Sequence, residues 1–525
     1  MSNKDGKKST TNTNPPSDKN PKKQLEGESY IGDFPIVFLV SLVFCSVIAI
    51  WGAIRPHQMT SVALSATSFM LQNLDWFFLS MSTFLVALCL YLAFGKYAHI
   101  KLGGPDEKPE FSTISWLSML FSAGMGCGLL FWGVAEPMFH FMSPPTIAAK
   151  TSEAARAAMV ITNFHWGLHA WGIYAISALI LAYFGFRKKK PYLCSTPIKE
   201  AFSGKYVEHV CHTTDVIAVL SVVFGVAGSL AMGVLQLSSG LNTSFHIATD
   251  STFFYLGILV FITICFMISA STSLDKGIKI LSNLNMSVAG FVLLFVIFAG
   301  PARFILEIFV NTLGDYATNI VRMSFHLYPY EGLQDWSSSW TLTYLIWWIA
   351  WGPFVGIFIA RISKGRTIRQ FIIGVLFLPT LFSILWFSAF GGAGFFIEIF
   401  GSGGLGELVQ EDVTKALFAL FDYYPLTLTL KILALFSIFV FLVTSADSAT
   451  FVIGMMTSHG NLNPSTKHKL TWGLVIAVLS ASSLLVGGIE VSKAIAISGA
   501  IPFSMILLLQ IVAFFRILRT EKESS

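Results

Sequence analysis

Charged residues are scarce in this sequence: Asp, Glu, Lys and Arg make up 12% of the 525 residues, against roughly 25% in ordinary soluble proteins. This deficit excludes a typical water-soluble globular protein. The net charge of +5 gives no support to a nucleic-acid partner. Cysteine is scarce as well, and the six residues show no metal-ligand spacing. We therefore interpret them as free thiols, not as a disulfide framework.

Apolar residues are abundant at 54%, and they gather into runs of about twenty residues, the length that crosses a bilayer. The sequence predicts an all-α membrane protein with twelve transmembrane helices. The predicted spans are 34–53, 76–95, 114–137, 157–184, 214–235, 252–270, 280–300, 340–360, 370–390, 427–456, 470–487 and 497–515.

The gaps between these spans predict the orientation of the chain. Most of the 34 Lys and Arg residues fall in alternate gaps and in both tails, and such residues are retained on the cytoplasmic side. We therefore expect both termini to be cytoplasmic, with residues 1–30 as a disordered tail and 516–525 as a short one. Two longer gaps, 301–339 and 391–426, contain apolar residues at helical spacing, at 304–310 and 405–421. We interpret both as amphipathic surface helices, with a loop in the rest of 301–339.

Two predicted spans contain helix-breaking residues. The third has Gly124, Gly126 and Gly128 within five residues, and the eighth has Gly352 directly before Pro353. Glycine in a membrane helix is more often a close-packing site, but proline removes a helical hydrogen bond. Five spans counted from each of these segments give two halves, 114–300 and 340–515. This order is typical of an inverted-repeat secondary transporter with its site at the midplane, here preceded by two extra helices in 31–113.

Aromatic residues lie inside the fourth and eighth spans. In the fourth span, at 100° per residue, Trp166, Trp171 and Tyr174 occupy one sector of the helix roughly 140° wide. In the eighth span, Trp348 and Trp351 are three residues apart and so lie near the same face. A single tryptophan is usually an anchor at the membrane surface, but these lie away from the span ends. Because neither aromatic segment contains Asp or Glu, a bound cation would contact ring faces, which is how quaternary ammonium groups are recognised.

Several motifs together resemble the betaine/carnitine/choline transporter family over roughly residues 30 to 515. The resemblance implies a leucine-transporter-type fold with two five-helix inverted repeats, in a bacterial cell membrane and often as a homotrimer. The motifs are Gly124–Gly128, Phe131–Pro137, His165–Tyr174, Trp347–Arg361, Lys364–Thr367 and Thr444–Ser448.

In proteins of this family an aromatic box holds a trimethylammonium group, and a broken helix offers backbone donors to a carboxylate. The positions of this sequence that match are Trp166, Trp171, Tyr174 and Trp348 for the box, Trp351 along the route, and Gly124, Met125, Gly126 and Gly128 for the backbone. Choline-transporting relatives often have Asp in place of Gly128. The neutral residue favours a zwitterion such as glycine betaine, while dimethylsulfoniopropionate, carnitine and ectoine remain open.

The resemblance also implies a sodium site. Its ligands would be the carbonyls of Ser122, Met125 and Phe441 and the hydroxyls of Thr444 and Ser445. Sodium-independent exchangers of the family carry a fixed cation in the seventh span, whereas residues 280–302 contain no Lys or Arg. We therefore expect sodium coupling, with no cofactor besides this ion.

Other functions remain open. The nearest is sodium-independent exchange of carnitine for a related betaine, followed by import of choline or dimethylsulfoniopropionate. An intramembrane acyltransferase could use His169 with Asp447, but no nucleophile motif supports an enzyme. Glu136 is either functional or structural. His165 and His169 lack a nearby Cys or carboxylate in the sequence, which favours packing or gating over metal binding.

Overall fold

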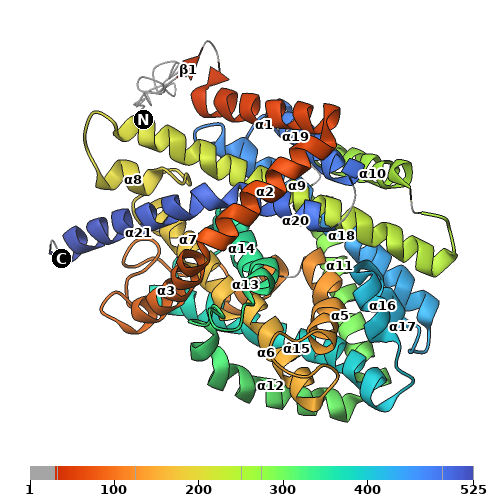
Figure 1. Cartoon of the computed structure of the whole chain (residues 1–525). Coiled ribbons are helices and arrows are strands. Elements are labelled where there is room, and N and C mark those ends of the chain that lie inside the picture. The colour runs from red at the N-terminus through yellow and green to blue at the C-terminus, as the bar shows by residue number, and fades with distance from the viewer. Residues whose placement is uncertain are drawn as a thin grey trace, which may run out of the picture.

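The described part of the chain is almost entirely helical (Figure 1). The computed structural model describes residues 30–31, 34–124, 126–249, 251–272, 275–486 and 489–523. Strands β1 (Tyr30–Ile31) and β2 (Phe34–Pro35) form a short antiparallel pair before the first helix. Eleven helical stretches within the described residues are long and apolar enough to cross a membrane. The prediction of an all-helical membrane protein is confirmed.

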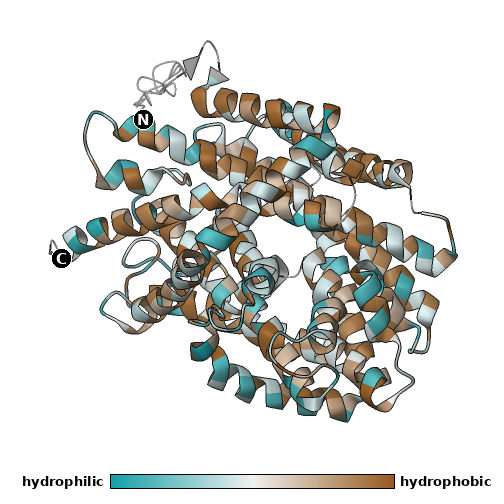
Figure 2. Ribbon diagram, viewed as in Figure 1, coloured by the Kyte–Doolittle hydropathy of each residue, from teal (hydrophilic) through white to brown (hydrophobic). Residues whose placement is uncertain are grey.

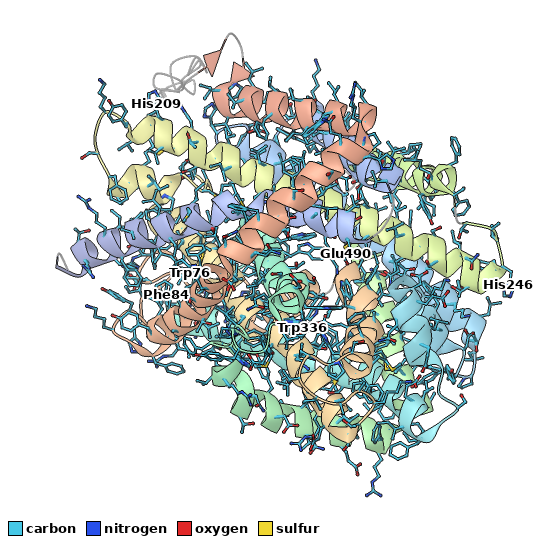
Figure 3. All side chains as sticks on the ribbon, viewed as in Figure 1. Trp76, Phe84, His209, His246, Trp336 and Glu490 are labelled. Atoms are coloured by element: carbon cyan, nitrogen blue, oxygen red, sulfur yellow. The ribbon has the colours of Figure 1, made fainter. Side chains whose placement is uncertain are left out.

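The N-terminal region contains one helix that the sequence reading missed. Between the first two spans the chain forms α2, which begins at Pro56, a residue whose fixed φ suits the first turn of a helix. Trp76 and Phe84 of α3, labelled in Figure 3, are exposed, as expected of a helix with a lipid-facing side. The bounds are α1 (Ile36–Ile54), α2 (Pro56–Asn73) and α3 (Asp75–Phe94).

The third predicted span is broken, as its glycines predict. Helix α4 (Thr113–Gly124) ends where the glycine motif begins, and α5 (Cys127–Met142) starts after Gly126, whose backbone is extended. Met125 lies outside the described residues. With 12 and 16 residues, neither helix alone is long enough to count among the eleven stretches.

The fourth span is also broken, which was not predicted. Helix α6 ends at Trp166 and α7 begins at Leu168, with Gly167 between them in a non-helical conformation. The remaining elements of this half are α6 (Ser152–Trp166), α7 (Leu168–Ala182), the π-helical turn η2 (Tyr183–Arg187), α8 (Thr196–Ala201), α9 (Val207–Phe245), α10 (Thr252–Ser271) and α11 (Asp275–Ala299).

The predicted break in the eighth span is wrong, because α14 runs without interruption through Pro353. Its glycines are packing sites: a Cβ on Gly352 would lie 3.3 Å from the Ser177 hydroxyl of α7, and one on Gly356 would lie 3.2 Å from the Ser177 Cβ. Helices α7 and α14 therefore pack closely along this line.

Between the two predicted halves the chain forms α12, which packs against α6 and α15 along one edge of the molecule (Figure 1). The bounds are α12 (Ala302–Met323), α13 (Gln334–Ser337), η3 (Ser338–Leu342), α14 (Thr343–Arg361), α15 (Ile368–Phe400), α16 (Leu405–Glu411), η4 (Val413–Lys415), α17 (Ala416–Phe421), α18 (Thr427–Met456), α19 (Thr466–Val486), α20 (Ile489–Ser498) and α21 (Ala500–Glu523).

Residues 405–421 are not the single surface helix that the sequence predicts. They form three short pieces, α16, η4 and α17, and all six side chains of α17 are buried. Asp412 interrupts the helical pattern because its backbone is extended and its side chain accepts a hydrogen bond from the N–H of Thr414.

Burial separates the inner helices from the outer ones. In the most apolar stretch of α6 to η2, 94% of the residues are buried, whereas the corresponding values are 33% for α1, 22% for α10 and 33% for α11. Figure 2 shows apolar residues over the outer helices too. The poorly buried helices can therefore face lipid, while α6 and α7 are in the middle of the bundle.

Candidate functional site

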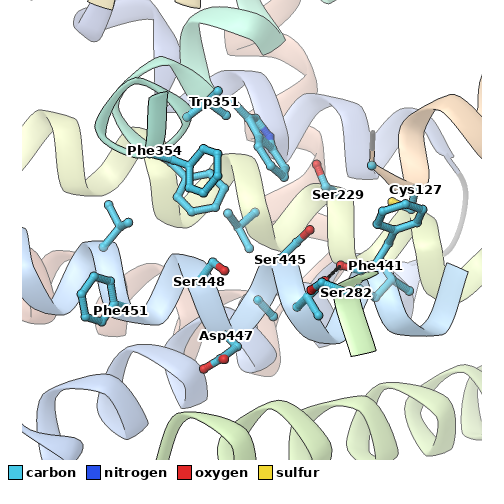
Figure 4. Close-up of a pocket in the computed structure, with 18 of the residues that line it drawn as sticks. Cys127, Ser229, Ser282, Trp351, Phe354, Phe441, Ser445, Asp447, Ser448 and Phe451 are labelled. Carbon is cyan, nitrogen blue, oxygen red and sulfur yellow. Dashed lines mark hydrogen bonds between the residues drawn. The ribbon is translucent and has the colours of Figure 1, made fainter. Parts of the chain in front are cut away.

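A cavity of about 1140 Å³ lies among α5, α7, α9, α14 and α18. Part of it is shown in Figure 4, where Trp351 and Ser445 approach it from different helices. All the predicted aromatic residues and two of the predicted glycines line this cavity: Trp166, Trp171, Tyr174, Trp348, Trp351, Gly126 and Gly128. Gly124 is the last residue of α4.

The aromatic rings form a connected group on the cavity wall. The ring centroids of Trp166 and Trp348 are 5.0 Å apart at an interplanar angle of 73°. Tyr174 lies 5.8 Å from Trp348 and 5.7 Å from Trp171, both nearly perpendicular. Such edge-to-face contacts hold neighbouring rings at an angle to one another, so several ring faces can surround one cation.

Hydrogen bonds fix the two central indoles. Trp166 Nε1 donates to Glu136 Oε2 at 2.8 Å, and Trp348 Nε1 donates to the carbonyl oxygen of His165 at 2.7 Å. His165 is itself held, with Nδ1 2.6 Å from Glu136 Oε1 and Nε2 2.9 Å from Thr341 Oγ1. The polar edges of both indoles are thus occupied by protein groups.

This arrangement corrects the interpretation of His165. A carboxylate does lie beside it, because Glu136 reaches it from α5, 29 positions away along the chain. Glu136, His140 and His165 have ligand atoms within 4.8 Å of one another and could hold a metal ion. However, both oxygens of Glu136 already have nitrogen partners in His165 and Trp166. We interpret the group as a hydrogen-bonded anchor of the aromatic residues.

Tyr344 is a cavity residue that the sequence reading missed. Its ring stacks on His165 at 4.9 Å and 16°, and it lies 5.6 Å from Trp166 and 6.3 Å from Trp348. The sequence could have indicated this residue, because Tyr344 is one helical turn before Trp348 and therefore lies on the same face of α14.

Trp351 differs from the other tryptophans of the site. Its indole N–H is buried and has no hydrogen-bond partner among the described residues, although the ring lines the cavity. A buried donor without a partner costs free energy. Trp351 Nε1 faces Gly225 of α9, where an added Cβ would lie 3.4 Å from this nitrogen, so the ring of Trp351 lines the cavity while its N–H does not.

The predicted sodium ligands lie partly in this cavity. Phe441, Thr444 and Ser445 of α18 line it, as Figure 4 shows for Phe441 and Ser445. The Thr444 hydroxyl donates to the carbonyl of Val440 at 2.8 Å, which leaves its lone pairs available to a cation. Ser122 lies in α4, and Met125 lies outside the described residues.

The two residues proposed for an acyltransferase have separate partners. His169 Nε2 lies 3.1 Å from Ser324 Oγ. Asp447 accepts a hydrogen bond of 2.9 Å from Ser269 and so links α18 to α10.

At its other end the cavity reaches Glu110, Asn463 and Lys469, which lie in gaps that the charge pattern assigns to the cytoplasm. Beside this end, Lys364 pairs with Glu107 at 2.6 Å, and the N–H of Gly365 donates to the carbonyl of Leu102. The hydrogen bond from Lys364 lowers the pKa of the exposed Glu107 carboxyl below its usual value. These contacts join the loop before α4 to the loop after α14.

Comparison with known proteins identifies the family. Residues 36–523 match the model of the BCCT, betaine/carnitine/choline family transporters. The chain belongs to this family. It is similar to the glycine betaine transporter OpuD of Bacillus subtilis, with 44% identity over 93% of this chain and 94% of the relative. The ectoine/hydroxyectoine transporter of Virgibacillus pantothenticus is 43% identical over 92% of this chain and 96% of its own.

A third relative, the glycine betaine transporter of Acinetobacter baylyi, is 37% identical over 93% of this chain and 74% of its own length. Membership confirms the resemblance drawn from the motifs. This BCCT protein is a transporter, not an enzyme, and it is a multi-pass membrane protein.

Proposed function

We propose that this transporter imports a betaine-type zwitterion, glycine betaine first, by alternating access coupled to sodium. The observation that carries the proposal is the contact between the aromatic group and the broken helix: a Cβ on Gly128 would lie 3.0 Å from Trp166 Cη2. The backbone at the start of α5 is therefore beside the ring of Trp166. A short molecule with a cation at one end and a carboxylate at the other could contact both.

The cation would bind to the faces of Trp166, Trp171, Tyr174 and Trp348. Ring faces suit a trimethylammonium group, which cannot donate an N–H hydrogen bond, and each desolvated contact contributes about 2 kcal/mol. The carboxylate would bind at the N-terminus of α5, where free N–H groups and the helix dipole favour an anion.

Sodium would bind beside this site, between α18 and the end of α4, with the ligands named above. One sodium ion that moves down a tenfold gradient and ~100 mV releases about 3.7 kcal/mol, enough for roughly 500-fold accumulation of a neutral zwitterion. This amount suits an importer of compatible solutes.

The same proposal includes the finer architecture. Helices α4 and α5 together would form the twelfth span, and residues 114–300 and 340–515 would be the two inverted repeats of a leucine-transporter-type fold. With both termini cytoplasmic in a bacterial membrane, the cavity would open inward. We also propose a homotrimer, on the strength of the family resemblance.

Ectoine is the second candidate substrate. It is also a zwitterion with a delocalised cation, and one relative that is 43% identical is an ectoine/hydroxyectoine transporter. The site described above has no residue that only a trimethylammonium group would need, so the two substrates must be compared directly.

Uptake into proteoliposomes tests the proposal. Labelled glycine betaine is offered with an inward sodium gradient or with potassium in its place, and unlabelled ectoine, carnitine and choline compete. We expect sodium-dependent accumulation that Thr444→Ala abolishes. Thr450→Ala is the matched control, because this hydroxyl also bonds to its own helix but does not line the cavity.

Two results would contradict the proposal. Uptake that needs a preloaded betaine and ignores sodium would mean exchange. If Thr444→Ala and Thr450→Ala change uptake to the same extent, Thr444 is not a ligand of the sodium ion.

A further inference from the structure

The break at Gly167 interrupts a helix in the middle of the bundle. Gly167 has φ −98° and ψ −133°, so the hydrogen bonds of α6 do not continue into α7. Backbone groups released by such a break need partners, because hydrocarbon offers none. The aromatic residues Trp166 and Trp171 lie on the two sides of the break, so whatever holds the break also sets their relative orientation.

Side chains from three different helices supply these partners. The carbonyl of His165 accepts from Trp348 Nε1 of α14, and the carbonyl of Trp166 accepts from Ser383 Oγ of α15 at 3.3 Å. The N–H of Leu168 donates to Tyr316 Oη at 2.9 Å. In an unbroken helix this N–H would bond to the carbonyl four residues earlier, so the tyrosine oxygen replaces a helical acceptor.

Tyr316 differs from the other two because it comes from α12, which lies at the edge of the bundle (Figure 1). On α12, Leu306, Val310 and Val321 are exposed, whereas only 5% of Tyr316 is exposed. Its hydroxyl fits against the break so closely that a Cβ on Gly167 would lie 2.5 Å from Tyr316 Oη. The absence of a side chain at Gly167 is what allows this contact.

Helix α12 is fastened to the fourth span at further points. Asp315, the neighbour of Tyr316, accepts two hydrogen bonds from the Arg156 guanidinium of α6, one of them at 2.9 Å. Ser324, just after α12, lies with Oγ 3.1 Å from His169 Nε2 of α7. Contacts on both sides of the break mean that a shift of α12 relative to the bundle must move α6, α7 or both.

We propose that Tyr316 is a positioning residue of the substrate site: by accepting from Leu168 N–H it holds the break at Gly167 and thereby the angle between Trp166 and Trp171. Helix α12 thus controls substrate affinity from the edge of the bundle without contacting substrate. The proposal rests on the proposed function, because its readout is the binding of a zwitterion in the aromatic site.

Tyr316→Phe tests this, because it removes the hydroxyl and keeps the ring. Without the acceptor, Leu168 N–H is left unpaired unless α6 and α7 rejoin, and rejoining would turn Trp166 relative to Trp171. We expect KM for glycine betaine to rise by at least ~5-fold, which corresponds to about 1 kcal/mol of lost substrate binding, because Trp166 and Trp171 would no longer be held at the angle of the binding site; kcat should change much less. Hydrogen–deuterium exchange of a peptide that covers residues 164–172 should become faster.

Tyr424→Phe is the matched control. Tyr424 is also buried, and its hydroxyl donates to the carbonyl of Val296 at 3.0 Å, which joins the turn between α17 and α18 to α11. It should lower stability to a similar extent but leave KM and the exchange of 164–172 as in the wild type. A hydroxyl that only stabilises the fold would give the same result at both positions.

The outcomes separate this inference from the proposed function. If the wild type transports glycine betaine and Tyr316→Phe leaves KM within twofold, the inference is overturned and the proposed function stands. If the wild type transports neither glycine betaine nor ectoine, the proposed function fails. In that case the hydrogen–deuterium exchange of residues 164–172 decides the role of Tyr316. Unchanged exchange in Tyr316→Phe would overturn that role, whereas faster exchange in Tyr316→Phe but not in Tyr424→Phe would support the role of Tyr316 in stabilising the break.

Discussion

The third and eighth predicted spans are similar in sequence and different in structure. Both contain glycines and a proline, yet the first is divided into α4 and α5 and the second is the continuous helix α14. Proline does not decide this, since Pro137 lies inside α5 as Pro353 lies inside α14. The difference lies in what surrounds the glycines.

Among the described residues, an added Cβ at Gly126 would approach the nitrogen of Gly128 alone, at 4.0 Å, whereas at Gly356 it would meet Ser177 and the backbone of Ala178 at 3.2–3.3 Å. Gly126 borders the cavity, and Gly356 borders a neighbouring helix. A glycine beside empty space can thus leave the backbone open to a ligand, whereas one beside a helix allows close packing.

The largest effect is expected on stability, from adding a side chain at Gly356, where α14 packs against α7. Gly356→Val would force α14 away from α7, because the added atoms would meet backbone as well as the Ser177 side chain. Overpacking of this kind costs about 3 kcal/mol, which thermal unfolding in detergent would detect. Gly257→Val in α10 is the control, since nothing lies within 4 Å of its Cβ position. Equal destabilisation of both variants would refute the packing role.

A somewhat smaller change in free energy, in substrate binding, is expected from removing the aromatic ring of Trp348 on α14. Trp348→Ala deletes a ring that contacts both Trp166 and Tyr174. A lost cation–π contact of about 2 kcal/mol corresponds to a roughly 30-fold higher KM for glycine betaine. Trp348→Phe keeps a ring but loses the N–H bond to His165, so an intermediate KM would be expected. An alanine variant with wild-type KM would exclude Trp348 from the site.

The smallest change in stability is expected at the break. Gly126 has extended backbone, with φ −125° and ψ 179°, which alanine adopts freely. Gly126→Ala should therefore change the free energy of unfolding by less than about 1 kcal/mol. Its methyl group would nevertheless crowd the proposed carboxylate site, so KM should rise a few-fold. We thus expect Gly356→Val to lower stability and Gly126→Ala to raise KM. A large loss of stability in Gly126→Ala, with wild-type stability in Gly356→Val, would contradict the roles assigned to the two glycines.

Much of the site could be predicted from sequence because it follows helical periodicity. Trp171 and Tyr174 share a face of α7 by spacing, and Trp166 lines the same cavity, although the break at Gly167 means that helical spacing does not relate Trp166 to them. The link between Glu136 and Trp166 could not be predicted, because it joins residues 30 positions apart on two helices.

The break at Gly167 was missed for a related reason. A lone glycine in an apolar run is ambiguous until its neighbours are known, and its decisive partner, Tyr316, lies 148 positions away from Leu168. Continuity of α14 was misjudged in the same way, because the sequence around Pro353 says nothing of Ser177. Local pattern predicts which residues can share a face, whereas distant contacts decide where a helix breaks.

The division of α4 and α5 also bears on how the protein is made. Helices of 12 and 16 residues extend about 18 and 24 Å, less than the ~30 Å core of a bilayer. If α4 and α5 together form one span, as proposed above, residues 113–142 would enter the membrane as one unit. Trp386, whose indole N–H donates to the carbonyl of Leu129 in α5, is synthesised 257 residues later. The newly made chain thus carries a helix pair that lacks this contact until α15 is made, and the proposed binding site would be among the last parts to be assembled.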